Sequence, residues 1–253
     1  MGKIISIANQ KGGVGKTTTT VNLAAWIGAK GKKVLLADID PQGNATSGFG
    51  INKRSLMRSS YDLLIGTAEA EDIILSTSFQ NVDVLPSNIA LAGAEIEIVE
   101  MEDRAMRLKK ALAPVKNRYD FIFIDCPPSL GLITLNALAA SDTLMVPIQC
   151  EYYALEGLSQ LVATIRQVKR LYNPTLDLEG VLLTMYDGRT NFSAQVAQEV
   201  RRHFPGKVLA TVVPRNVRLA EAPSHGLPVT SYDKFSRGAA AYRDMAEEVA
   251  KKL

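Results

Sequence analysis

The sequence predicts an α/β fold in which a mostly parallel, twisted sheet is covered by helices on both faces. Short apolar runs rich in β-branched residues alternate along the chain with longer segments of helical periodicity. Runs of this length are too short for helices, and runs that are apolar throughout are typical of parallel strands buried on both faces. The predicted strands are residues 4–8, 34–39, 82–85, 121–124, 144–148, 181–185 and 208–213.

Helical periodicity fills the segments between these strands. It predicts helices at residues 18–29, 95–112, 155–171, 192–204 and 238–252. Residues 43–80 are the least regular stretch and could form a mobile excursion. The chain shows no linker, low-complexity tract or internal repeat, so residues 1–253 are predicted to form a single domain.

The composition excludes several classes of protein. Hydrophobic residues make up 47% and charged residues 22%, which is ordinary for a globular protein. The net charge of +3 is mild, so any contact with nucleic acid must come from local clustering of basic residues. The chain contains no apolar run of about 18 residues, and its N-terminus does not resemble a signal peptide. The two cysteines form no disulfide framework, which favours a reducing, cytoplasmic compartment.

A glycine-rich loop follows the first predicted strand and leads directly into a predicted helix. This is the context that a phosphate-binding loop needs, because the glycines let backbone N–H groups converge on phosphate oxygens at a helix N-terminus. Lys16 is predicted to reach the β- and γ-phosphates of ATP, and the Thr17 hydroxyl to ligate Mg²⁺. The predicted ATP-binding residues of this single-domain P-loop fold are Lys11, Gly12, Gly13, Val14, Gly15, Lys16, Thr17 and Thr18.

Carboxylates follow two of the predicted strands. Asp125 ends one strand, where a P-loop protein holds Mg²⁺, and Asp38 and Asp40 end another. Neighbouring strand ends share one crevice in a parallel sheet, so we assign Asp40 to positioning or activating the attacking water and count it with Thr17 and Asp125 as a metal residue. Asp38 either supports Asp40 from behind or merely caps the turn before Pro41.

The loop departs from the standard phosphate-loop pattern in one place. Gln10 stands where the pattern has glycine, and a second lysine, Lys11, precedes the glycines. This combination is the deviant Walker A motif. Together with residues 38–46, 124–131 and 214–218, it resembles the ParA/Soj family of chromosome-partitioning ATPases, and the short chromosomal branch most closely. The resemblance spans essentially the whole chain.

The resemblance implies a function as well as a fold. It implies an ATP-dependent sandwich dimer that binds double-stranded DNA without sequence preference and lies on the nucleoid. A ParB-type partner stimulates the weak ATP hydrolysis, and the outcome is segregation of a chromosome or plasmid. The residues it implies are Lys11 for a catalytic contact to the second subunit's phosphates, Gly12 for the close dimer contact, Pro214 and Asn216 for the adenine base, and Arg189 and Arg218 for DNA.

Other readings of the same residues stay open at this point. Lys11 and the two arginines could be solvated surface residues. A membrane-positioning ATPase of the MinD type would need a basic amphipathic C-terminal helix, and the acidic, alanine-rich end of the chain disfavours it. An iron–sulfur reductase would need surface cysteines, whereas Cys126 is expected to be buried. A biosynthetic enzyme would need a substrate pocket with its own polar groups, and no motif indicates one.

Overall fold

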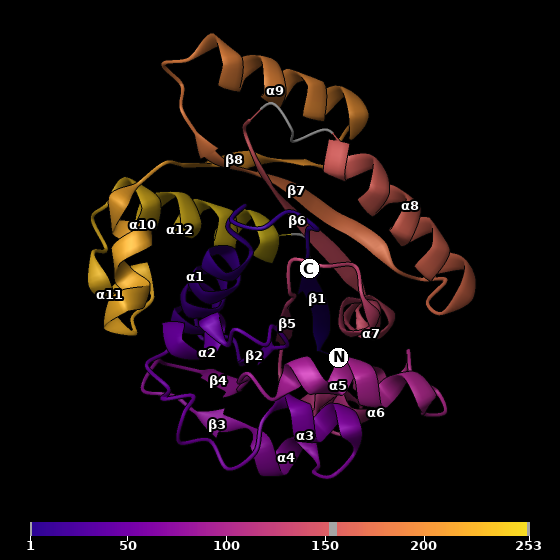
Figure 1. The fold of residues 1–253 in the computed structure, drawn as a ribbon. Helices are drawn as coiled ribbons and strands as arrows, with labels where there is room; N and C mark the ends of the chain where they lie inside the picture. Colours follow the sequence, from indigo (N-terminus) through magenta and orange to yellow (C-terminus); the bar gives the residue numbers. More distant parts are fainter. Residues whose placement is uncertain (1, 152–155, 252–253) are drawn as a thin grey trace.

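A computed structural model of the chain describes residues 2–151 and 156–251, with the backbone alone for residues 156–159. Within these residues, eight strands form one sheet in the order β3-β4-β2-β5-β1-β6-β7-β8 (Figure 1). All neighbouring pairs are parallel except β3 with β4, so the predicted mostly parallel sheet is confirmed. The strands are β1 Lys3–Ile7, β2 Val34–Asp38, β3 Leu75–Ser76, β4 Val82–Leu85, β5 Phe121–Asp125, β6 Thr143–Gln149, β7 Asp177–Tyr186 and β8 Val208–Pro214.

Helices cover both faces of this sheet, with α1 and α12 on one face and α6, α7 and α8 on the other (Figure 1). The main helices are α1 Lys16–Ala29, α2 Asn44–Gly48, α3 Ser60–Ile65, α4 Ala70–Ile73, α5 Leu91–Glu97, α6 Arg107–Leu112, α7 Leu132–Ala140, α8 Glu156–Leu171, α9 Asn191–His203, α10 Val217–Glu221, α11 Val229–Tyr232 and α12 Arg237–Ala250. The 3₁₀ turns are η1 Ile98–Glu100, η2 Lys116–Arg118 and η4 Ala222–His225.

The central strands pack on both sides, which explains why their sequences are mostly apolar. Ile4 belongs to the core beneath α7, and its neighbour Ile5 belongs to the core beneath α1. Ile122 and Phe123 of β5 alternate in the same way. Because successive side chains of a strand point to opposite faces, each strand supplies both cores at once.

Three sequence-based predictions differ from the structure. The helix predicted at residues 95–112 is broken into α5, η1 and α6, and Asp103 has a positive φ of 52° between them. Residues 43–80 contain α2, α3, α4 and the antiparallel edge strand β3. Helix α7 was missed, because its residues are buried nearly all round and show no polar face.

No helix in the described part of the chain is long and apolar enough to cross a membrane.

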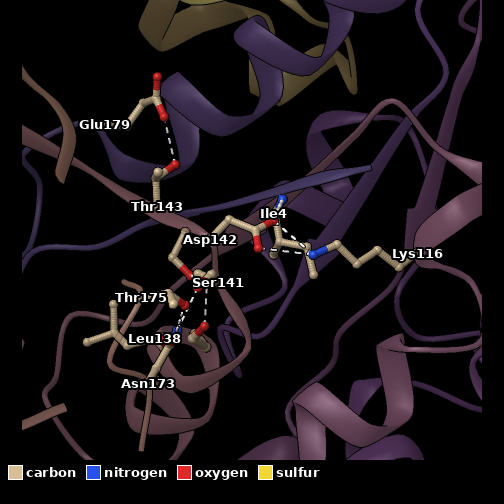
Figure 2. Close-up of polar contacts among 11 residues, drawn as sticks. Ile4, Lys116, Leu138, Ser141, Asp142, Thr143, Asn173, Thr175 and Glu179 are labelled. Atoms are coloured by element: carbon tan, nitrogen blue, oxygen red, sulfur yellow. Dashed lines mark hydrogen bonds and ion pairs between the residues drawn. The ribbon is translucent and has the colours of Figure 1, made fainter. Parts of the chain in front are cut away.

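Polar contacts join the elements at the amino-end edge of β1, β6 and β7 (Figure 2). Asp142 accepts a hydrogen bond from the Ile4 N–H at 2.8 Å and pairs with Lys116 at 3.0 Å. The buried amide of Asn173 donates to the carbonyls of Leu138 and Ser141. These contacts fix where the strands begin, and the parallel arrangement then brings their carboxyl ends together at the opposite edge.

Candidate nucleotide site

The glycine loop lies between the end of β1 and the start of α1. Gly13 and Gly15 have φ values of 73° and 90°, a left-handed conformation that costs glycine little. Gly15 is the N-cap of α1, and it has no side chain that could accept a bond from the first turn of the helix. The N–H groups of this turn are therefore available to an anion.

The Lys16 side chain folds back over this loop. Its Nζ donates to the Lys11 carbonyl at 2.9 Å, and the side chain is buried. Burial lowers the pKa of Lys16, while the nearby charges of Asp125 and Asp40 raise it. The ammonium group is therefore inside the site and bound to an uncharged oxygen, which a phosphate could replace as its partner.

Thr17 and Asp125 are in direct contact, which places a hydroxyl and a carboxylate close enough to share one metal ion. The Thr17 hydroxyl donates to Asp125 Oδ2 at 2.8 Å, and the Thr20 hydroxyl donates to Oδ1 at 2.9 Å. Burial, followed by the charge of Asp38 on the adjacent strand, raises the pKa of Asp125 to about 8. Hydroxyl and carboxylate oxygens are the donors that Mg²⁺ prefers.

The residues present fit Mg²⁺ better than a metal that needs a complete protein cage. The described residues contain no group of three or more His, Cys, Asp or Glu side chains that could hold a metal ion. Mg²⁺ commonly takes one or two protein ligands and completes its shell with water and phosphate oxygens. The donor set around Asp125 is of this kind.

Asp38 ends β2 and Asp40 follows it, and the two carboxylates lie in different environments. Asp38 is fully buried and accepts hydrogen bonds from the N–H groups of Asp40 and Thr46 and from the Thr46 hydroxyl. Burial raises the pKa of Asp38 to about 6. Asp40 accepts a hydrogen bond from the Gln42 N–H, and its negative charge lies close enough to raise the pKa of Lys16. Of the two roles left open for Asp38, these contacts favour support of the Asp40 turn from behind.

A cavity of about 240 Å³ lies beside the glycine loop. The loop side of its wall contains Gly15 and Thr18, and the other side contains Pro214 and Asn216 at the end of β8. Asn216 also caps α10, with its side-chain oxygen accepting from the Arg218 N–H. The structure thus places the two residues implied for the adenine base next to the phosphate loop.

Two threonines that hold the site together were missed in the sequence. Thr184 at the end of β7 donates its hydroxyl to the Val14 carbonyl at 2.8 Å, which ties the loop to a strand 170 residues away. The Thr20 hydroxyl is the second one that donates a hydrogen bond to the Asp125 carboxylate. No motif surrounds Thr184, whereas the run of threonines from Thr17 to Thr20 was a signal that could have been used.

Lys11 and Gly12 form the outer rim of the loop. The Lys11 ammonium pairs with the Glu151 carboxylate of the same chain. Among the described residues, a Cβ added at Gly12 would meet only Pro128 Cβ, at 3.9 Å, and Gly12 has no positive φ. Packing in the described part of the chain therefore gives no reason for glycine at this position.

Arg189 and Arg218 lie in segments that follow β7 and β8, at the same edge of the sheet as the loop. The Arg189 side chain is 89% exposed and binds the Asp187 carboxylate through two nitrogens. Arg218 pairs with Glu221 and Asp233. Both guanidinium groups therefore have acidic partners in the chain, which a DNA phosphate would have to replace.

The structure also places the two cysteines and the two histidines. Cys126 and Cys150 are both buried, contrary to what a shared surface cluster needs. His203 contacts the Glu199 carbonyl and His225 stacks on Tyr232. Tyr152 and Tyr153, whose place after Glu151 in the sequence suggests packing or interface residues, lie outside the described residues.

Known proteins share both the sequence and this arrangement. A family model described as AAA domain matches residues 2–178. The sporulation initiation inhibitor protein Soj of Bacillus subtilis is 61% identical over 250 residues, with 99% of each chain covered. The chromosome-partitioning ATPase Soj of Treponema pallidum is 49% identical, covering 98% of this chain and 97% of its own length. This chain belongs to the ParA/Soj family of chromosome-partitioning ATPases.

The family assignment inferred from the motifs is therefore confirmed. Among solved structures, a protein described as cobyrinic acid a,c-diamide synthase from Mycobacterium smegmatis, with bound ADP and magnesium, superposes with a TM-score of 0.86. It is 39% identical, and the match covers 98% of this chain and 93% of that one. The fold is thus one on which magnesium and an adenine nucleotide have been observed.

Proposed function

We propose that this chain binds ATP with Mg²⁺ at the glycine loop and uses ATP hydrolysis to control dimerisation and DNA binding in chromosome or plasmid segregation. The observation that carries the proposal is one continuous site. Lys16, the pair Thr17 and Asp125, and the cavity walled by Pro214 and Asn216 lie around the N-terminus of α1. A phosphate group, a metal ion and a base each have matching residues there.

The roles of the residues follow from this arrangement. The N–H groups from Gly13 to Thr18 would bind the phosphates, and Lys16 would exchange the Lys11 carbonyl for the β- and γ-phosphates. Thr17 and Asp125 would hold Mg²⁺, with Asp40 near it. Mg²⁺ supplies charge neutralisation on the phosphates when it is bound. Asp40 would position or activate the attacking water.

Dimerisation is supported by the exposed rim of the loop. Gly12 leaves room for a second backbone to approach, and no side chain that the structure describes uses that room. Lys11 would have to leave Glu151 before it could contact phosphates held by a second copy of the chain. Two copies placed with these rims together would share their nucleotides at the interface.

DNA binding would then depend on the dimer. A monomer offers few phosphate contacts, and a dimer doubles them on one rigid body, so the second set binds at high effective concentration. Arg189 and Arg218 are the proposed contacts, and a ParB-type partner on the DNA would stimulate hydrolysis and release the dimer from the nucleoid. Phosphate contacts alone give no sequence preference.

The test is retention of the protein on unrelated DNA duplexes with ATP, with ADP and without nucleotide. Tight binding should occur only when ATP is present. The logarithm of the binding constant should then fall linearly with the logarithm of the salt concentration. Arg189→Ala and Arg218→Ala should flatten this slope. Arg58→Ala, which also removes an arginine paired with an aspartate, should not. Equal retention in all three nucleotide states would contradict the switch.

The amide-forming activity in the name of the Mycobacterium smegmatis structure is not proposed for this chain. No contact in the described residues favours it over ATP-driven partitioning. The partition function rests on relatives of higher identity over nearly the whole chain.

A further inference from the structure

The hydroxyl group of Thr46 lies between two segments that are separate in the sequence. Thr46 is in the short helix α2, and its hydroxyl donates to Asp38 Oδ2 at 2.7 Å. The same hydroxyl oxygen accepts from the N–H of Ser87, just after β4, at 2.9 Å. Thr46 thereby connects the end of β2 with the end of β4.

The Asp38 carboxylate extends this connection to Asp40. One carboxylate oxygen accepts from both the N–H and the hydroxyl of Thr46, and the other accepts from the Asp40 N–H at 3.1 Å. Asp38, Thr46 and Ser87 are completely buried. Water therefore cannot replace a lost partner, and each broken contact would leave an unsatisfied polar group.

The backbone around Asp40 also packs tightly against the same strand end. Gly43 has a φ of 60°, and a Cβ added there would lie 2.6 Å from the Ser87 carbonyl oxygen. The Gly43 N–H donates to the Asp40 carbonyl at 2.8 Å. The turn that carries Asp40 is therefore fixed to the segment after β4 by a close backbone approach and by the Thr46 hydroxyl.

We propose that Thr46 is a positioning residue for ATP hydrolysis, which acts through Asp38 to hold Asp40 in the place from which its carboxylate acts on the attacking water. This proposal rests on the hydrolytic function and the Asp40 role proposed above. Lys16 and Thr17 belong to a different loop with its own contacts. Loss of the Thr46 hydroxyl should therefore lower kcat and leave nucleotide affinity nearly unchanged.

The test compares Thr46→Val with Thr46→Ser in the full chain, by ATP hydrolysis and by binding of a non-hydrolysable ATP analogue. Valine keeps the shape and removes the hydroxyl. We expect kcat to fall about 10- to 100-fold, because a displacement of about 1 Å at a reacting group can cost this much. The KM for ATP and the affinity for the analogue should change by less than about twofold, and Thr46→Ser should restore most of kcat.

The chain provides two matched controls. Thr143 donates its hydroxyl to the Glu179 carboxylate at 2.7 Å at the opposite edge of the sheet (Figure 2), so Thr143→Val removes the same kind of contact away from the site. Ser87→Ala keeps the N–H that Thr46 uses and removes a hydroxyl without a hydrogen-bond partner in the described part of the chain. Both variants should keep the wild-type kcat.

The outcomes separate this inference from the proposed function. A wild-type chain that does not hydrolyse ATP, or an Asp40→Ala variant with normal turnover, would overturn the proposed function. If Asp40→Ala stops turnover but folded Thr46→Val keeps it, only the role of Thr46 is wrong. The role of Thr46 is also wrong if kcat falls as far in Thr143→Val as in Thr46→Val, or if Thr46→Ser does not restore kcat. Should Thr46→Val not fold, Thr46→Cys, with its weaker S–H donor, must show an intermediate kcat.

Discussion

At the amino ends of the strands, Asp142 and Glu179 each meet a lysine, whereas at the carboxyl ends Asp125 accepts hydrogen bonds from hydroxyl groups. Lys116 pairs with Asp142, and Lys3 pairs with Glu179 at 2.8 Å. At the other edge the nearby cation, Lys16, donates to a backbone carbonyl instead of pairing with Asp125.

This difference separates an edge that stabilises the fold from an edge that is prepared for a ligand. A buried carboxylate held only by neutral donors costs stability, and the raised pKa values of Asp38 and Asp125 reflect that cost. A magnesium ion would supply the positive charge that Asp125 lacks as a partner, and a phosphate would supply the negative charge that Lys16 lacks. The comparison predicts that substitutions at the carboxyl-end edge change activity, whereas those at the amino-end edge change stability.

The largest expected effect is that of Lys16→Ala. It removes the cation that the site holds ready for the phosphates, and ATP turnover should fall by at least about 100-fold. Lys116→Ala, the control at the opposite edge, removes the cation beside Asp142 and should keep wild-type turnover. Steady-state hydrolysis of both purified variants checks this, and normal turnover in Lys16→Ala would remove the basis for the phosphate-loop assignment.

Two glycines should respond to valine in opposite ways. Gly12→Val should fold and bind ATP normally but fail to dimerise, because the Cβ has space among the residues that the structure describes and would clash with a second copy. Gly28 is different, since a Cβ there would lie 2.5 Å from the Gln80 carbonyl oxygen and 2.6 Å from Val82 Cγ2. Gly28→Val should therefore lower the melting temperature.

Sedimentation velocity with an ATP analogue, together with thermal melting, tests this pair. The expected pattern is a monomeric Gly12→Val protein with the wild-type melting temperature. A normal dimer for Gly12→Val would count against the shared interface, and an unfolded one would show that the glycine serves the chain itself.

Asp142→Ala tests the stabilising edge directly. It leaves the Ile4 N–H without its acceptor and Lys116 without its partner, so it should cost about 1–3 kcal/mol of unfolding free energy. For a chain of this size that corresponds to a fall in melting temperature of about 2–4 °C per kcal/mol. ATP turnover below the melting transition should equal that of the wild type, and a loss of turnover there would show that the two edges are not independent.

The parts of this molecule that were predictable from sequence are those whose signal is local. Strand β5 was recognisable because a buried parallel strand is apolar along its run, here residues 121–124, and the glycine loop because its residues are contiguous. Helix α7 was missed for the same reason that β5 was found, since a helix buried nearly all round also lacks a polar period. The break between α5 and α6 depends on Asp103, whose positive φ no periodicity reveals.

The site shows the same limit. Thr17, Asp40 and Asp125 were predicted because each lies in a recognisable loop or near the end of a recognisable strand. Thr184 contacts Val14 and Thr46 contacts Ser87, and both contacts depend on how the strands are ordered in the sheet. The order of strands is a property of the whole chain, so no local pattern could indicate these hydroxyl contacts.

The smallest expected effect is the pH dependence of stability in the nucleotide-free protein, measured between pH 6 and pH 8. The pKa of Asp125 is about 8 in the folded chain and close to 4 when unfolded, so the folded state holds a proton that the unfolded state has released. Stability falls with rising pH wherever the folded state binds more protons. The free energy of unfolding should therefore decrease from pH 6 to pH 8, by at most about 1.4 kcal/mol per pH unit from this group.

Asp125→Asn cannot ionise and should lose most of this slope, because burial would no longer oppose a charge. Chemical denaturation of both proteins across this range, without nucleotide or Mg²⁺, is the measurement. Equal slopes would mean that Asp125 is already ionised at pH 6, and the contrast between the two edges would lose its electrostatic basis.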